Sequence, residues 1–140
     1  MRSSCRPPSA CPILVSASPA GRLSAGDGAI KVGRMLEHYN TFHFEEPIPF
    51  TDVDGMAQSA AALDIPLAAG EQQHTRYDFK ELLVRGAADI VQPDVTKCGG
   101  LSEGKKIAAL ADAFGKYVTT SVGLAAHLHY WASTPPAARP

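Results

Sequence analysis

The chain alternates between short apolar runs and longer stretches in which apolar residues recur every three or four positions. The runs have the length of buried strands, and the longer stretches have the period of amphipathic helices. Because a helical stretch separates each run from the next, consecutive strands are expected to be parallel, which predicts an α/β fold of repeated (β/α) units. The expected strands cover residues 11–15, 41–45, 65–69, 88–91 and 117–120.

The helical stretches carry start and stop signals. Ser24 can cap the first, Thr51 or Asp52 the second and Thr75 the third, and Gly86 stands where a residue in the left-handed conformation would end the third helix. Apolar residues at helical spacing are expected to face the core. They are Ala29, Val32, Leu36 and Tyr39, then Val53, Met56, Ala57, Ala60 and Leu63, then Phe79, Leu82 and Leu83, then Ile107, Leu110, Ala111 and Phe114.

A carboxylate follows each of three consecutive apolar runs. Glu45, Glu71 and Asp94 stand about 25 residues apart, which is the length of one strand, one helix and two short loops. The carboxyl ends of parallel strands meet at one edge, where β/α folds build their sites. Three carboxylates there would repel each other unless a hard cation or a proton neutralised them. The pattern therefore predicts a divalent-metal site.

Two histidines lie near this edge. His43 shares a strand face with Glu45 by the period of two, and we interpret it as a packed, hydrogen-bonded core residue rather than a ligand. His74 lies in the loop after the third strand, so it is a candidate substrate contact. The alternative for His74 is a loop residue bonded to its neighbours.

Composition narrows the possible partners. The 13 Lys and Arg residues nearly balance the 14 Asp and Glu residues, so nucleic acid and anionic membranes are poor partner candidates. No apolar run approaches the roughly 18 residues of a membrane span. The three cysteines lack metal-ligand spacing, which favours a reducing compartment and a cytoplasmic location.

The chain divides into three expected parts. Residues 1–24 form a leader rich in proline and serine, with one possible edge strand at 11–15, residues 25–134 form the (β/α) body, and residues 135–140 form a tail. A complete eight-unit barrel needs at least about 200 residues, whereas this chain has 140. It is therefore either a smaller open α/β domain or a piece of a barrel.

Several short motifs resemble the enolase superfamily, in its mandelate racemase/muconate lactonizing enzyme branch. The motifs are Phe44-Glu45-Glu46-Pro47, Ala69-Gly70-Glu71, Gln92-Pro93-Asp94 and Cys98-Gly99-Gly100. The stretch 70–77 is most similar to the sugar-acid dehydratases, and the resemblance covers about residues 25–134. It implies part of a TIM-type (β/α)7β barrel, a Mg²⁺ ion, and proton abstraction α to the carboxylate of a sugar acid through an enediolate.

The resemblance also implies residue roles. Glu45 and Glu71 would be two of three Mg²⁺ ligands, with Glu46 or Asp94 as the first alternatives for a missed third ligand. Asp94 would orient a catalytic histidine on the next strand. The chain departs from the family at two places: no acid stands at 15–18, where the first metal ligand is expected, and no histidine follows Val118 directly.

We therefore expect a truncated relative of a Mg²⁺-dependent dehydratase or racemase that is inactive alone and binds Mg²⁺ weakly. The alternative is a non-catalytic fragment that self-associates or pairs with a full-length relative, because an incomplete barrel leaves strand edges unpaired. A homo-oligomer is expected in either case. A small doubly wound binding domain ranks last, because no glycine-rich phosphate motif follows the first strand.

Overall fold

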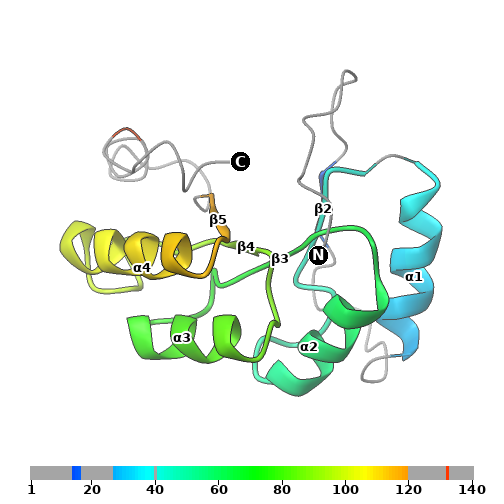
Figure 1. Ribbon diagram of the computed structural model, residues 1–140, viewed down its shortest axis with the longest axis horizontal. Helices are drawn as coiled ribbons and strands as arrows, with labels where there is room; N and C mark the ends of the chain where they lie inside the picture. Colours follow the sequence, from blue (N-terminus) through cyan, green and yellow to red (C-terminus); the bar gives the residue numbers. More distant parts are fainter. Residues whose placement is uncertain (1–13, 17–26, 40, 120–131, 133–140) are drawn as a thin grey trace.

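The computed structural model describes residues 14–16, 27–39, 41–119 and 132 (Figure 1). Strands and helices alternate along this part of the chain, as the hydrophobic pattern predicts. The elements are β1 (Leu14–Ser16), α1 (Asp27–Glu37), β2 (His43–Glu45), α2 (Val53–Ala62), β3 (Leu67–Ala69), α3 (Arg76–Val84), β4 (Ile90–Val91), α4 (Leu101–Ala113) and β5 (Tyr117–Val118).

The five strands form one parallel sheet in the order β1-β2-β3-β4-β5, so strand order equals chain order. Crossovers between parallel strands are right-handed, and a sheet wound in one direction therefore carries its helices on one face. Figure 1 shows α1 to α4 following one another around the outside of the sheet. This is the arrangement of consecutive barrel units, whereas a doubly wound sheet carries helices on both faces.

The strand register shows which residues share a face of the sheet. Phe44 aligns with Leu67, and both belong to the core that the strands share with the helices. The opposite face carries Glu45 beside Ala68 and Ala68 beside Ile90. Ala68 and Ile90 are buried as well, so the middle of the sheet is covered on both faces. The face that bears Glu45 corresponds to the interior of a barrel.

The predicted caps are largely confirmed. Asp52, not Thr51, caps α2, because its Oδ1 accepts a hydrogen bond from Gly55 N at 2.8 Å. Thr75 caps α3 as predicted, and Gly86 follows that helix with φ +67°. The Thr75 side chain therefore sets the start of α3, and the left-handed backbone of Gly86 follows its end.

Two residues predicted to face the core are exposed. Tyr39 is 70% exposed and Phe114 is 43% exposed. Both predictions are wrong for the same reason: α1 ends at Glu37 and α4 at Ala113, so these side chains lie beyond the turns that the helical period assumes.

The leader apart from β1, the Ser24 cap and the tail lie outside the described residues, so the division into three parts stays a prediction. Within the strand predicted at 11–15, Leu14 and Val15 belong to β1, which pairs with β2. None of the described helices is long and apolar enough to cross a membrane.

Candidate functional site

Three carboxylates lie at the carboxyl ends of three adjacent parallel strands. Glu45 is the last residue of β2, Glu71 follows β3 after Gly70, and Asp94 lies three residues beyond β4. We call Glu45, Glu71 and Asp94 the carboxylate rim. Their placement agrees with the pattern of apolar runs, whereas their roles as ligands and orienting acid stay predictions.

Lys97 joins two members of the carboxylate rim. Its Nζ lies 3.7 Å from Glu71 Oε1 and 3.9 Å from Asp94 Oδ2. The turn after β4 places this side chain, because Lys97 N donates a hydrogen bond to Asp94 O at 3.0 Å. Lys97 is absent from the residues that the sequence pattern predicts for the site. The signal that could have found it is a lysine three residues after an acid in a turn at a strand end.

Glu46 is a partly buried acid beside the rim. Its φ is +37°, a conformation that non-glycine residues adopt rarely, and its Oε1 accepts a hydrogen bond from Gly70 N at 3.4 Å. Burial raises the pKa of the Glu46 carboxyl, and the charges of Glu71 and Glu45 raise it further, whereas the hydrogen bond from Gly70 N and the charge of Lys97 lower it. Glu46 therefore belongs electrostatically to the same cluster.

Asp94 is held in one orientation by its own turn. Its side chain is buried, with the residue 8% exposed, and Oδ1 accepts hydrogen bonds from Thr96 N at 2.8 Å and Thr96 Oγ1 at 2.7 Å. Oδ2 faces Lys97. The resemblance implies a histidine partner for Asp94 just after β5. The chain carries Thr119 there, and the residues that follow lie outside the described part.

His43 is a packed core histidine, as predicted, at 6% exposure. Burial lowers the pKa of its imidazole, and the Glu45 carboxylate opposes that shift. The predicted hydrogen bond is wrong for the part of the chain that the structure describes: there neither ring nitrogen has a hydrogen-bond partner, and Nε2 lies 3.8 Å from Glu45 Oε2, beyond hydrogen-bond range. The ring instead packs edge-on against Phe42, with centroids 5.3 Å apart.

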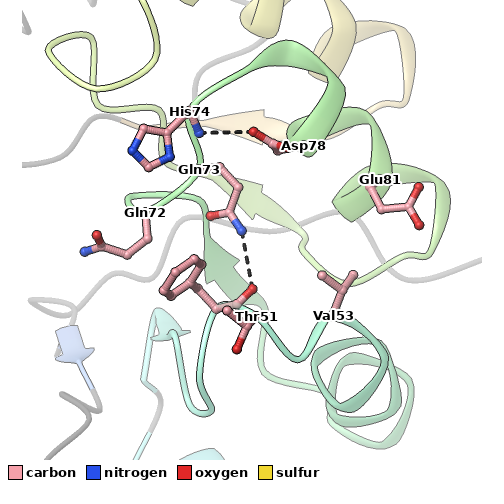
Figure 2. Close-up of a pocket in the computed structure, with 8 residues that line it drawn as sticks. Thr51, Val53, Gln72, Gln73, His74, Asp78 and Glu81 are labelled. Atoms are coloured by element: carbon pink, nitrogen blue, oxygen red, sulfur yellow. Dashed lines mark hydrogen bonds between the residues drawn. The ribbon is translucent and has the colours of Figure 1, made fainter.

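His74 lies at a cleft beside the carboxylate rim. Figure 2 shows its exposed side chain near Gln72, in the loop before α3. The cleft has a volume of about 250 Å³ and is bounded on the other side by Phe50 and Thr51. Gln73 Nε2 donates a hydrogen bond across it to Phe50 O at 3.4 Å. Rim carboxylates do not line this cleft, so a substrate contact by His74 stays a prediction.

The described residues offer an incomplete set of ligands for a metal ion. Among residues 14–16, 27–39 and 41–119, no three His, Cys, Asp or Glu side chains come together as a metal-ligating group. Mg²⁺ requires near-octahedral oxygen coordination and loses its water reluctantly, so a pair of carboxylates holds it poorly. The fit to Mg²⁺ is therefore incomplete.

Consecutive parallel (β/α) units with acids at their strand ends define part of a barrel whose site lies at the carboxyl end. The model of the enolase C-terminal domain-like family matches residues 15–140, and the chain belongs to that family.

Curated relatives are enzymes that act on sugar acids or their lactones, by their names. L-talarate/galactarate dehydratase of Salmonella typhimurium is 39% identical over 107 residues, which are 76% of this chain and 27% of that enzyme. D-galactarolactone cycloisomerase of Agrobacterium fabrum is 39% identical over 113 residues, which are 77% of this chain and 30% of that enzyme. The chain thus spans less than a third of the length of these relatives.

Solved structures show the same fold. A racemase from Streptomyces coelicolor A3(2) with bound magnesium superposes with a TM-score of 0.81 at 32% identity, covering 89% of this chain and 34% of the racemase. A variant of L-talarate/galactarate dehydratase liganded with Mg and L-glucarate gives a TM-score of 0.80 at 36% identity, covering 89% of this chain and 31% of the dehydratase. The expected barrel-type α/β fold is therefore confirmed.

Proposed function

We propose that the chain carries part of the metal- and substrate-binding edge of a sugar-acid dehydratase or racemase. The observation that carries the proposal is the carboxylate rim, in which Glu45, Glu71 and Asp94 end three consecutive parallel strands. Relatives named for galactarate and galactonate, and a relative with bound L-glucarate, support a sugar acid as the substrate class.

In this proposal Glu45 and Glu71 contribute oxygen ligands to Mg²⁺, and Asp94 orients an imidazole that acts as a base. Bound Mg²⁺ in such enzymes stabilises negative charge on the substrate carboxylate. The chain alone binds the ion weakly and does not turn over substrate, because catalysis requires a complete ligand set held within tenths of an ångström.

Calorimetry with Mg²⁺ tests the metal part. We expect binding in the full chain that is weaker than micromolar and is lost in Glu71→Gln. The matched control is Glu81→Gln, which removes a carboxylate from α3 that pairs with Arg85 away from the rim. Submicromolar affinity, or equal binding by Glu71→Gln and the unmodified chain, would contradict the assignment.

A dehydration and racemisation assay with galactarate, galactonate and glucarate tests the catalytic part. We expect no product above background from the purified chain. Turnover that disappears in Glu71→Gln would show instead that the chain is a complete catalyst.

A second candidate function is a non-catalytic fragment that self-associates, and one observation favours it. Among the described strands, β1 pairs with β2 alone and β5 with β4 alone, so the sheet ends in two parallel edges. Edges of this kind pair readily with another chain. Size-exclusion chromatography with light scattering tests the expected homo-oligomer; a monomer at all concentrations would contradict it. The cytoplasmic location stays a prediction.

A further inference from the structure

The carboxylate rim and Glu46 concentrate negative charge at one end of the sheet. Glu45 ends β2, Glu71 follows β3 and Asp94 follows β4, so three carboxylates lie at the ends of adjacent strands. Carboxylates crowded in this way need a compensating cation. Among the described side chains, Lys97 forms ion pairs with two of these carboxylates, Glu71 and Asp94.

Lys97 supplies such a cation beside Glu71 and Asp94. Besides its ion pairs with Glu71 and Asp94, its Nζ donates hydrogen bonds to Glu71 O at 3.3 Å and Gln72 Oε1 at 3.4 Å. The ammonium therefore contacts the loop after β3 and the turn after β4 at once.

The backbone holds Lys97 in this place. Lys97 N and Cys98 N both donate to Asp94 O, at 3.0 and 2.8 Å, and the Asp94 side chain accepts from Thr96. The Lys97 side chain is 34% exposed, so its charge is only partly screened by water. The turn therefore fixes the backbone from which the Lys97 side chain reaches Glu71 and Asp94.

We propose that Lys97 is the resident cation of the carboxylate rim, a positioning residue that holds Glu71 and Asp94 together and competes with a divalent cation for the Glu71 carboxylate. The competition rests on the proposed function, because it assumes that Glu71 binds metal. The holding role, in which Lys97 keeps Glu71 and Asp94 together, does not depend on metal binding.

Coulomb repulsion between the Lys97 ammonium and a bound cation predicts the direction in which Lys97 changes the Mg²⁺ affinity. An ammonium within ion-pair distance of Glu71 lies within a few ångströms of any ion that this carboxylate binds, which is enough to change Mg²⁺ affinity by about tenfold. Removing the charge should therefore tighten Mg²⁺ binding. A purely structural role would predict the opposite, because a disordered rim binds a cation less well.

The experiment compares three variants of the full chain by calorimetry with Mg²⁺. Lys97→Met removes the charge and keeps the length of the side chain, and Lys97→Arg keeps the charge. Lys116→Met is the matched control: Lys116 Nζ pairs with Asp89 at 2.7 Å, but both residues lie before their strands, at the opposite end of the sheet.

We expect Lys97→Met to bind Mg²⁺ about tenfold more tightly than the unmodified chain. Lys97→Arg and Lys116→Met should stay within about twofold of it, since neither removes charge from the rim. Unchanged or weaker binding by Lys97→Met, or an equal gain in Lys116→Met, overturns the competition.

Urea unfolding without Mg²⁺ tests the holding role independently. We expect Lys97→Met to lower the unfolding midpoint, and to lower it less when Glu71→Gln is already present, because the partner charge is then gone. Equal shifts in the two backgrounds overturn the holding role. If neither the unmodified chain nor Lys97→Met binds Mg²⁺ while this coupling is found, the proposed metal function fails and Lys97 remains the resident cation.

Discussion

Gly70 lies directly against the ring of Phe79, so closely that a Cβ on Gly70 would meet Phe79 Cε1 at 2.6 Å. The contact brings the end of β3 onto the first turns of α3 and leaves Glu71, the next residue, at the carboxylate rim. Gly70 also has φ +125°, which disfavours any side chain.

Gly70→Ala should therefore destabilise the chain by about 2–4 kcal/mol, from backbone strain and overpacking together. Gly86→Ala is the control, because Gly86 has φ +67° but the described residues place no atom within 4 Å of a new Cβ. It should cost about 1–2 kcal/mol, from strain alone. Urea unfolding measures both, and equal losses would contradict the role of the Phe79 contact.

Glu46→Gln should stabilise the chain at neutral and higher pH. Burial and the neighbouring carboxylates raise the folded-state pKa of Glu46 above its ordinary value of 4.5, so the folded chain holds this proton more tightly than the unfolded chain does. Stability from this group is then full below the unfolded pKa and is lost as the pH rises through the folded pKa. Gln keeps an oxygen for the Gly70 N–H and carries no charge.

The measurement is the urea midpoint of Glu46→Gln and of the unmodified chain, without Mg²⁺, at about pH 4 and pH 8. The variant should gain at the higher pH, and the gain should shrink towards the lower one. A loss of stability at the higher pH would show that ionised Glu46 is favourable in the folded chain.

Thr75→Ala should lower the free energy of unfolding by about 1 kcal/mol, because it removes the N-cap of α3. Thr75 Oγ1 accepts from Asp78 N at 3.4 Å, and Asp78 Oδ2 accepts from Thr75 N at 2.8 Å, so both halves of a capping box are present. Thr75→Ser keeps the hydroxyl and should cost only a few tenths of that amount. Thermal unfolding separates the two, and an equal loss in both would assign the effect to the Thr75 methyl group.

Cys98 should resist alkylation while the chain is folded. The residue is 1% exposed, and burial raises the pKa of its thiol, an effect that the charge of Asp94 increases. The thiolate is the reactive form, so both access and ionisation are reduced. Mass spectrometry of the Cys98 peptide after iodoacetamide treatment should show labelling in urea and little labelling without urea. Equal labelling under the two conditions would contradict the burial of Cys98.

The sequence predicts the elements well where local chemistry and burial agree. Thr75 and Gly86 delimit α3 because each satisfies a backbone requirement that few other residues meet. The positions of Phe44 and Leu67 in apolar runs predict that they are core residues, because the strands of a buried parallel sheet are apolar throughout. The placement of Glu45 follows from the same pattern, since a strand end is an edge of the sheet.

The rest of the site depends on loop conformation, which periodicity does not describe. Lys97 reaches Glu71 only because the turn after β4 folds back on Asp94. The positive φ of Glu46 has no sequence signal, because glutamate rarely adopts it. The sequence also does not predict that the His43 nitrogens lack a hydrogen-bond partner among the described residues, since buried polar atoms normally find partners.

The agreement between strand order and chain order has a consequence for folding. Each strand pairs with the strand of the adjacent unit, as in repeat proteins, where each unit is stabilised by its neighbours. β3 has partners on both sides, whereas β1 and β5 each have one among the described strands. Local opening should therefore begin at the outer units and reach β3 last, so amide hydrogen exchange is expected to be slowest at Leu67–Ala69 and faster towards β5.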